Sequence, residues 1–139
     1  MRLETIHPDD LGPAEIDLWR AHQRARPDLA SPYLTPEWAR IVADIRDDAR
    51  ICVIDDGAGF FAAQRLSPFA AMGLGAPITD YQGVVASAAL DIEPSALCRS
   101  LKVGRIDLTH VPEGAAPMKV SGAEGSWIAE TQGSHDLYN

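Results

Sequence analysis

The sequence predicts a single α+β domain, an α/β sandwich in which helices flank a mixed, largely antiparallel sheet. The chain has 139 residues, of which 46% are hydrophobic, and this length supports one core but not two of ordinary size. Segments with strand-like alternation are interleaved with segments of helical period. The turn-forming run DDGAG at residues 55–59 separates two apolar runs, a pattern typical of an antiparallel hairpin.

The N-terminal segment predicts a strand followed by a helix. Residues 2–7 alternate between polar and apolar side chains, and Pro8 closes this first strand. The helix ends before Pro27. Its expected buried face consists of apolar residues at helical spacing, with Trp19 at the border: Leu11, Ala14, Leu18, Ala21 and Ala25.

A second helix is predicted to begin at Pro36, because Thr35 can cap its N-terminus and proline suits the first helical position. Its expected apolar face consists of Trp38, Ile41, Val42 and Ile45. Two interpretations of Trp38 are open. It is either the core anchor of this helix or a direct contact to a ligand.

The remaining elements follow from apolar runs and turn residues. Residues 51–54 and 60–66 form the two strands of the hairpin, and residues 67–75 form a loop. Further along we expect a strand at Val84-Val85, a helix that starts at Asp91–Pro94 and ends at Gly104, a strand over 105–111, short strands at 118–120 and 127–130, and a polar tail over 132–139.

Charge and composition exclude several classes of protein. The chain has 12 Lys and Arg against 20 Asp and Glu, a net charge of -8, so it lacks the basic footprint of a nucleic-acid partner. No segment approaches the ~20 apolar residues of a membrane span, and no hydrophobic signal core opens the chain. We therefore expect a cytoplasmic protein without a membrane span. The two cysteines, Cys52 and Cys98, form no CxxC motif and are predicted to pack as small core residues.

Catalytic and metal-binding motifs are missing from the sequence. There is no GxSxG nucleophile motif. The four histidines (His7, His22, His110 and His135) are far apart and lack metal-ligand spacing. Three pairs of adjacent aspartates occur at predicted helix ends or turns, where acids accept backbone hydrogen bonds. No metal site is expected, and no catalytic residue can be named.

The stretch APITDYQGVV, residues 76–85, interrupts strand-like residues with Asp80 and Tyr81. One interpretation is a turn, since Asp accepts local backbone hydrogen bonds and Gly83 can adopt dihedrals that other residues avoid. The other is the polar edge of a binding cleft.

Two quoted segments carry a resemblance to a known family. With SPYLTPEW at Ser31–Trp38 and GAPITDYQG at Gly75–Gly83, the chain resembles the N-terminal half of the CelD/BcsL-type, FemAB-like acyltransferases of the GNAT superfamily. The resemblance extends from about Leu3 to about Glu130 and implies a GNAT-like half-domain over residues 1–131. Such enzymes pair two GNAT-like halves in one chain, and the CelD-like group modifies bacterial polysaccharide or cell-envelope acceptors.

The chain departs from this family at the cofactor motif. A half that binds acetyl-CoA carries a Q/R-x-x-G-x-G/A loop whose backbone N–H groups hold the pyrophosphate. Residues 64–68 lack the glycines, and residues 102–105 lie at the wrong end of their helix. The chain therefore resembles the half that holds no cofactor. The resemblance implies that acetyl-CoA or another acyl-CoA binds a C-terminal half, the expected partner, which would follow Asn139.

The resemblance also implies a place for the acceptor, in the cleft between the two halves. Four residues are candidate substrate-binding residues for a small-molecule acceptor such as an amino sugar: Asp80, Tyr81, Gln82 and Trp38. The alternative is that Asp80 and Tyr81 only brace their loop. For the chain as a whole, the alternative to an inactive transferase half is a free-standing, non-catalytic GNAT-like interaction module. We also expect self-association through the sheet edge that a second half would cover.

Overall fold

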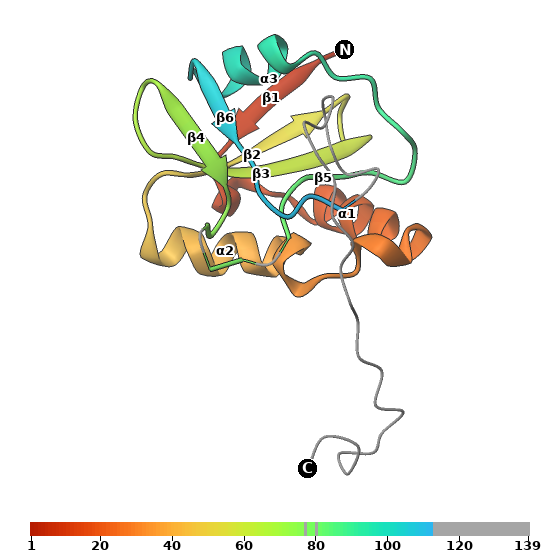
Figure 1. The fold of residues 1–139 in the computed structure, drawn as a ribbon. Helices are drawn as coiled ribbons and strands as arrows, with labels where there is room; N and C mark the ends of the chain where they lie inside the picture. The colour runs from red at the N-terminus through yellow and green to blue at the C-terminus, as the bar shows by residue number, and fades with distance from the viewer. Residues whose placement is uncertain (77, 80, 113–139) are drawn as a thin grey trace, which may run out of the picture.

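A computed structural model describes residues 1–76, 78–79 and 81–112 and shows an α+β fold, which confirms the predicted fold class (Figure 1). The helices are α1 (Pro13–Ala25), α2 (Pro36–Ile45) and α3 (Pro94–Leu101), with short 3₁₀ turns at Pro8–Asp10, Pro27–Leu29 and Pro32–Leu34. The strands are β1 (Leu3–Ile6), β2 (Ala49–Ile54), β3 (Gly59–Arg65), β4 (Ala70–Gly73), β5 (Val84–Val85) and β6 (Arg105–Asp107). The strands expected at 118–120 and 127–130 and the tail lie outside the described residues.

The strands form one sheet in the order β1-β2-β3-β4-β6. All neighbours in this order are antiparallel except β4 and β6, which are parallel and joined through α3. The predicted hairpin is β2–β3, and Ile54 pairs with Gly59 at its end. Its turn places Asp55, Asp56 and Gly57 at positive φ (46°, 58° and 116°), a conformation that Asp and Gly tolerate better than most residues.

One edge of β3 is divided between two strands. β4 pairs with Ala63–Arg65, whereas β5 pairs with Phe60 and Phe61. The chain therefore leaves this edge after Gly73 and returns to it at Val84. We call residues 74–83 the excursion loop.

The predicted loop over residues 67–75 is wrong at 70–73, which form β4. The sequence AAMG lacks the β-branched and aromatic residues that indicate a strand. Residues 70–73 nevertheless form a strand, because pairing with β3 on one side and β6 on the other supplies the backbone hydrogen bonds.

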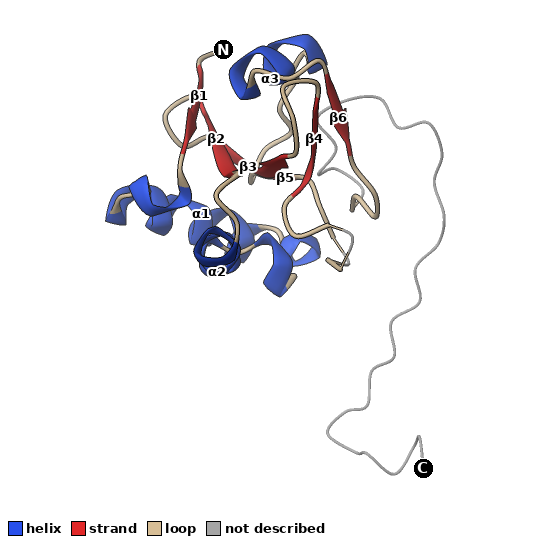
Figure 2. Cartoon of the chain, turned by 90° about the vertical axis from the view of Figure 1, so that its left-hand side faces the viewer, coloured by secondary structure: helices blue, strands red, loops and turns tan. Residues whose placement is uncertain are grey.

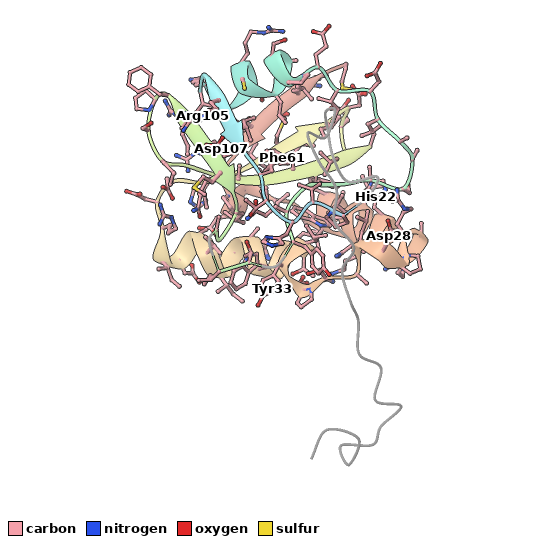
Figure 3. All side chains as sticks on the ribbon, in the orientation of Figure 1. His22, Asp28, Tyr33, Phe61, Arg105 and Asp107 are labelled. Carbon is pink, nitrogen blue, oxygen red and sulfur yellow. The ribbon has the colours of Figure 1, made fainter. Side chains whose placement is uncertain are left out.

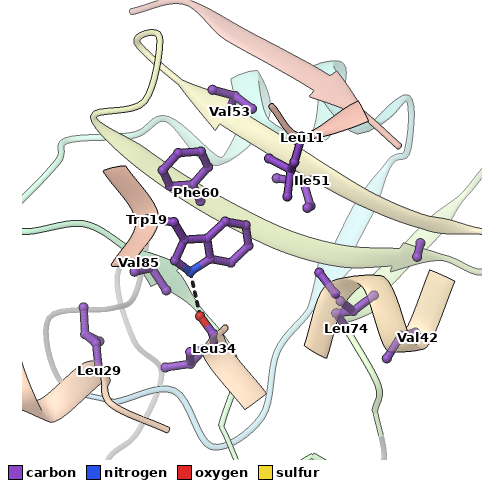
Figure 4. Packing of buried hydrophobic residues seen from close by; sticks show 12 residues of the cluster. Leu11, Trp19, Leu29, Leu34, Val42, Ile51, Val53, Phe60, Leu74 and Val85 are labelled. Carbon is purple, nitrogen blue, oxygen red and sulfur yellow. Dashed lines mark hydrogen bonds between the residues drawn. The ribbon is translucent and has the colours of Figure 1, made fainter. Parts of the chain in front are cut away.

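Helices cover both faces of the sheet (Figure 2). α1 and α2 lie on one face over a core that includes Trp19 and Phe60, whose rings stack at 4.8 Å (Figure 4). The indole Nε1 of Trp19 also donates a hydrogen bond of 2.7 Å to the carbonyl of Leu34, so this buried ring is fully satisfied. α3 covers the other face, where Leu97 and Leu101 pack in the core that contains Phe61.

The predicted buried faces of the first two helices need correction. In α1 the buried residues are Trp19 and His22, whereas Leu18 is 42% exposed. Burying the indole removes more apolar surface from water than burying a face of alanines, and this decides the rotation of the helix. In α2 the expected Val42 is buried, but Ile41 and Ile45 are 51% and 82% exposed.

Two boundaries near the end of the described chain also differ from the prediction. α3 ends at Leu101, and its C-cap Lys102 adopts the left-handed conformation (φ 58°) two residues before the expected Gly104. The strand predicted over 105–111 stops at Asp107, where its pairing with β4 ends, and His110 has a positive φ of 53° that a strand does not allow. In the described part of the chain, no helix has the length and hydrophobicity needed to cross a membrane.

Candidate functional site

The excursion loop, the 3₁₀ turn Pro32–Leu34 and the first turn of α2 contribute one aromatic residue each: Tyr81, Tyr33 and Trp38. The rings of Tyr33 and Trp38 meet edge to face, with centroids 5.1 Å apart. Tyr33 and Tyr81 both line a small cavity of about 10 Å³, room for a single water. All three side chains are partly buried. We call them the aromatic cluster, and Figure 3 shows Tyr33 on the side of the molecule that carries α1 and α2.

A buried glutamine of β3 holds the first part of the excursion loop. Gln64 is 2% exposed, and its Oε1 accepts a hydrogen bond of 3.0 Å from the backbone N–H of Gly75. Its Nε2 donates to the carbonyl of Ala76 at 3.0 Å. A buried amide is costly unless it is hydrogen-bonded, so these two bonds fix the point at which the loop leaves the sheet.

A second buried glutamine holds the end of the loop. Gln82 is 3% exposed; its Nε2 donates to the hydroxyl of Thr79 at 3.2 Å, and its Oε1 accepts from the backbone N–H of Thr109 at 3.0 Å. The amide therefore links the loop to the segment that follows β6. These contacts are those of a residue that braces the loop, a role that the sequence analysis considered for Asp80 and Tyr81 but not for Gln82.

Trp38 presents an unusual donor toward the excursion loop. Its Nε1 is buried and has no hydrogen-bond partner among the described residues. Gly75, at φ +82°, lies against this ring, and a Cβ added there would come within 2.8 Å of Trp38 Cζ2. An unpaired buried donor costs about 1–3 kcal/mol, so the indole N–H is available to any acceptor that reaches it.

Of the predicted site residues, Trp38 contacts Tyr33 through its ring, and Tyr81 and Gln82 line the small cavity together with Tyr33. Asp80 lies outside the described residues, and its role stays a prediction. Sequence reasoning missed Tyr33, although it lies inside SPYLTPEW. It also missed Gln64, whose only sequence signal is an amide within an apolar strand.

The arrangement supports binding through ring faces, hydroxyls and an indole N–H. Elsewhere, the two nitrogens of the buried His22 contact Ser87 and the carbonyl of Gly57, each at 2.8 Å, so neither is free to act on a ligand. Burial raises the pKa of the Cys52 thiol, which makes it a poor nucleophile. Among the described residues, no three His, Cys, Asp or Glu side chains lie close enough to hold a metal ion.

The chain matches no family model, no curated protein and no solved structure. Its function is therefore argued from the aromatic cluster and the fold around it.

Proposed function

We propose that this chain is the N-terminal, acceptor-side half of a GNAT-type N-acyltransferase that works in the cytoplasm on a cell-envelope or polysaccharide-related acceptor. The half is inactive alone, and a C-terminal half of the same natural chain supplies the acyl-CoA site. The aromatic cluster carries the proposal. Its partly buried rings have hydroxyl and N–H groups at their edges, which suit a small, hydroxyl-rich acceptor such as an amino sugar. Because the cavity beside the rings admits only one water, the acceptor would lie against the outer edge of the cluster, in the cleft that the second half completes.

The arrangement of the sheet supports the proposal. Its antiparallel strands and single parallel pair, β4 and β6, give the mixed, largely antiparallel sheet with flanking helices that the family resemblance implies. α3 lies in the connection that joins this parallel pair, and its N-terminus is a poor place for the donor. A diphosphate there needs free backbone N–H groups, but Pro94 removes one of them and Glu93 places a carboxylate at the N-cap.

Thermal unfolding of this chain with each candidate ligand tests the proposal. We expect an amino sugar such as glucosamine to raise the melting temperature, since a ligand that binds only the folded state adds about 2.7 kcal/mol at a hundredfold excess over its dissociation constant. We expect no effect of acetyl-CoA at the same concentration. Stabilisation by acetyl-CoA would contradict the half-domain assignment, and no response to any amino sugar would contradict the acceptor role.

Kinetics of the longer enzyme separate acceptor binding from loop bracing. If Asp80 and Tyr81 orient the acceptor, Asp80→Asn and Tyr81→Phe should each lower the kcat/KM measured for the acceptor. The expected loss of transition-state stabilisation is about 1–3 kcal/mol. The KM for acyl-CoA should not change. If the pair only braces the loop, both variants should melt earlier while the folded enzyme keeps its acceptor kinetics.

A second candidate function is a free-standing, non-catalytic interaction module. The exposed isoleucines of α2 favour it, since Ile41 and Ile45 lie one turn apart and are 51% and 82% exposed. The natural reading frame distinguishes the two candidates. A continuation past Asn139 that contains a Q/R-x-x-G-x-G/A loop supports the transferase half, and a stop codon there supports the module.

A further inference from the structure

A polar groove lies at the start of β2 and the end of β3, well separated from the aromatic cluster. It has a volume of about 320 Å³ and is lined by Asp47, Asp48, Arg50, Arg65, Ser67 and Pro68. Volumes of this order are typical of small-ligand sites.

The two arginines of the groove extend from the sheet face that α3 covers elsewhere. Arg50 pairs directly with Ala63, and Arg65 lies two residues further along β3, so all three side chains share one face. Ala63 belongs to the core beneath α3, whereas the aromatic cluster packs on the core of the opposite face. The groove is therefore independent of the proposed acceptor site.

The charges of the groove do not balance. The Asp48 carboxylate forms an ion pair with Arg46, which donates to its two oxygens at 2.8 and 2.6 Å. These hydrogen bonds lower the pKa of the Asp48 carboxyl. Asp47, Arg50 and Arg65 form no ion pair with a described residue. The lining itself holds two aspartates and two arginines. Because Arg46, from outside the lining, neutralises Asp48, the remaining charges of Asp47, Arg50 and Arg65 leave an excess of one positive charge in a chain whose net charge is -8.

One of these arginines is held in place by the backbone. The guanidinium of Arg50 donates from one nitrogen to the carbonyls of Asp47 and Ala49, at 2.9 and 2.7 Å. These two bonds fix the orientation of the group and leave its other N–H groups for a ligand.

Apart from the exposed Asp47 carboxylate, the unpaired hydrogen-bonding groups of the groove are donors. The hydroxyl oxygen of Ser67 accepts from the backbone N–H groups of Phe69 and Ala70, at 3.1 and 3.3 Å, so its remaining capacity is its own hydrogen. Arg65 Nε is buried and has no hydrogen-bond partner among the described residues. The group that the site lacks is therefore an acceptor with negative charge.

We propose that this groove binds the carboxylate group of a small molecule, with Arg50 and Arg65 as its charged partners and the Ser67 hydroxyl as a neutral donor. A single negative charge balances the excess of the groove. A phosphate carries more charge than that near pH 7, so the Asp47 carboxylate repels it more strongly than it repels a monoanion, and phosphate is disfavoured.

Titration of the isotope-labelled chain with acetate, followed by NMR, tests this site. Acetate should give saturable shifts of the amides around Arg50 and Ser67. Arg65→Gln should weaken acetate binding about tenfold or more, because a hydrogen bond between charged groups contributes about 1.5–3 kcal/mol. Arg24→Gln removes the same charge from an exposed position on α1 and should bind acetate like the wild type. Inorganic phosphate at matched ionic strength is the competing ligand.

Several outcomes would overturn the assignment: no saturable response to acetate, equal affinity in Arg65→Gln, or tighter binding of phosphate than of acetate. If Arg65→Gln does not fold, Arg50→Gln takes its place with the same expected loss. Tyr81→Phe should leave acetate binding unchanged, so the result does not depend on the acceptor site.

Discussion

The buried imidazole of His22 joins three segments that are far apart in the sequence. From α1, its Nε2 contacts the carbonyl of Gly57 in the β2–β3 turn at 2.8 Å. Its Nδ1 accepts a hydrogen bond of 3.1 Å from the backbone N–H of Ser87, just after β5. Because that N–H already carries the shared proton, Nδ1 is unprotonated, and the proton of the ring lies on Nε2, which donates to Gly57. This single tautomer satisfies both partners.

Replacing His22 with alanine should lower the free energy of unfolding by about 2–4 kcal/mol, because the buried carbonyl of Gly57 and the partly buried N–H of Ser87 lose their partner and the ring leaves a cavity. Urea denaturation followed by circular dichroism measures the change. Arg24→Ala, at an exposed position on the same helix, is the control and should change stability by less than about 0.5 kcal/mol. Equal stability of the two variants would contradict the role of His22 in joining α1, the β2–β3 turn and the segment after β5.

Sequence reasoning could exclude a metal motif around His22 but could not find its partners. Gly57 and Ser87 lie 35 and 65 residues away, and no local pattern marks a backbone group that will need an acceptor or a donor. The same limit applies to Gln64 and Gln82. Their amides look like surface groups until the excursion loop folds over them.

The path of the excursion loop depends on the absence of a side chain at Gly75. Gly75 has a φ of +82°, and a Cβ there would approach Thr79 Cγ2 to 2.6 Å and Trp38 Cζ2 to 2.8 Å. A side chain at this position would be strained by its backbone and would displace the indole of the aromatic cluster.

Gly75→Ala should therefore destabilise the protein by about 2 kcal/mol or more, and it should also weaken acceptor binding. Gly104→Ala is the matched control, because a Cβ there meets only the carbonyl of Phe69 at an ordinary 3.5 Å. That control should lie within about 1 kcal/mol of the wild type. Thermal melting of both variants decides the point, and a neutral Gly75→Ala would show that the loop tolerates a different path.

Most elements could be predicted because their signals are local. Thr35 caps α2 as expected, accepting a hydrogen bond of 3.1 Å from the Trp38 N–H, and the β2–β3 hairpin follows its turn residues. The predictions that were wrong concern features that depend on contacts between distant segments. β4 is a strand because β3 and β6 flank it, and the rotation of α1 is decided by the stacking of Trp19 on Phe60.

At the scale of the whole molecule, the two helical layers differ in how well they are covered. α3 buries Leu97 and Leu101 almost completely. On the opposite side, α2 buries Ala39 and Val42 but leaves Ile41 and Ile45 in solvent. Two large apolar side chains one turn apart on an exposed helix favour association.

We therefore expect the chain to self-associate, with an average mass in sedimentation equilibrium that rises with concentration. Ile41→Gln/Ile45→Gln should shift this equilibrium toward the monomer without loss of stability, because both side chains are already exposed. Leu66→Gln, an exposed apolar position in the segment between β3 and β4, is the control and should associate like the wild type. A wild-type chain that stays monomeric at all concentrations would rule out this surface.

The divided edge of β3 has a consequence for how this fold can diversify. β4 and β5 dock on separate parts of the same strand, and each register is fixed by its own pairs: Ala63 with Gly73, and Phe60 with Val85. Neither register depends on the length of the chain between β4 and β5. Descendants of this protein that keep Gly75 and Gln82 as the anchors of the loop can therefore change the length and sequence between them while the sheet keeps its order, so ligand preference can evolve by loop replacement on an unchanged scaffold.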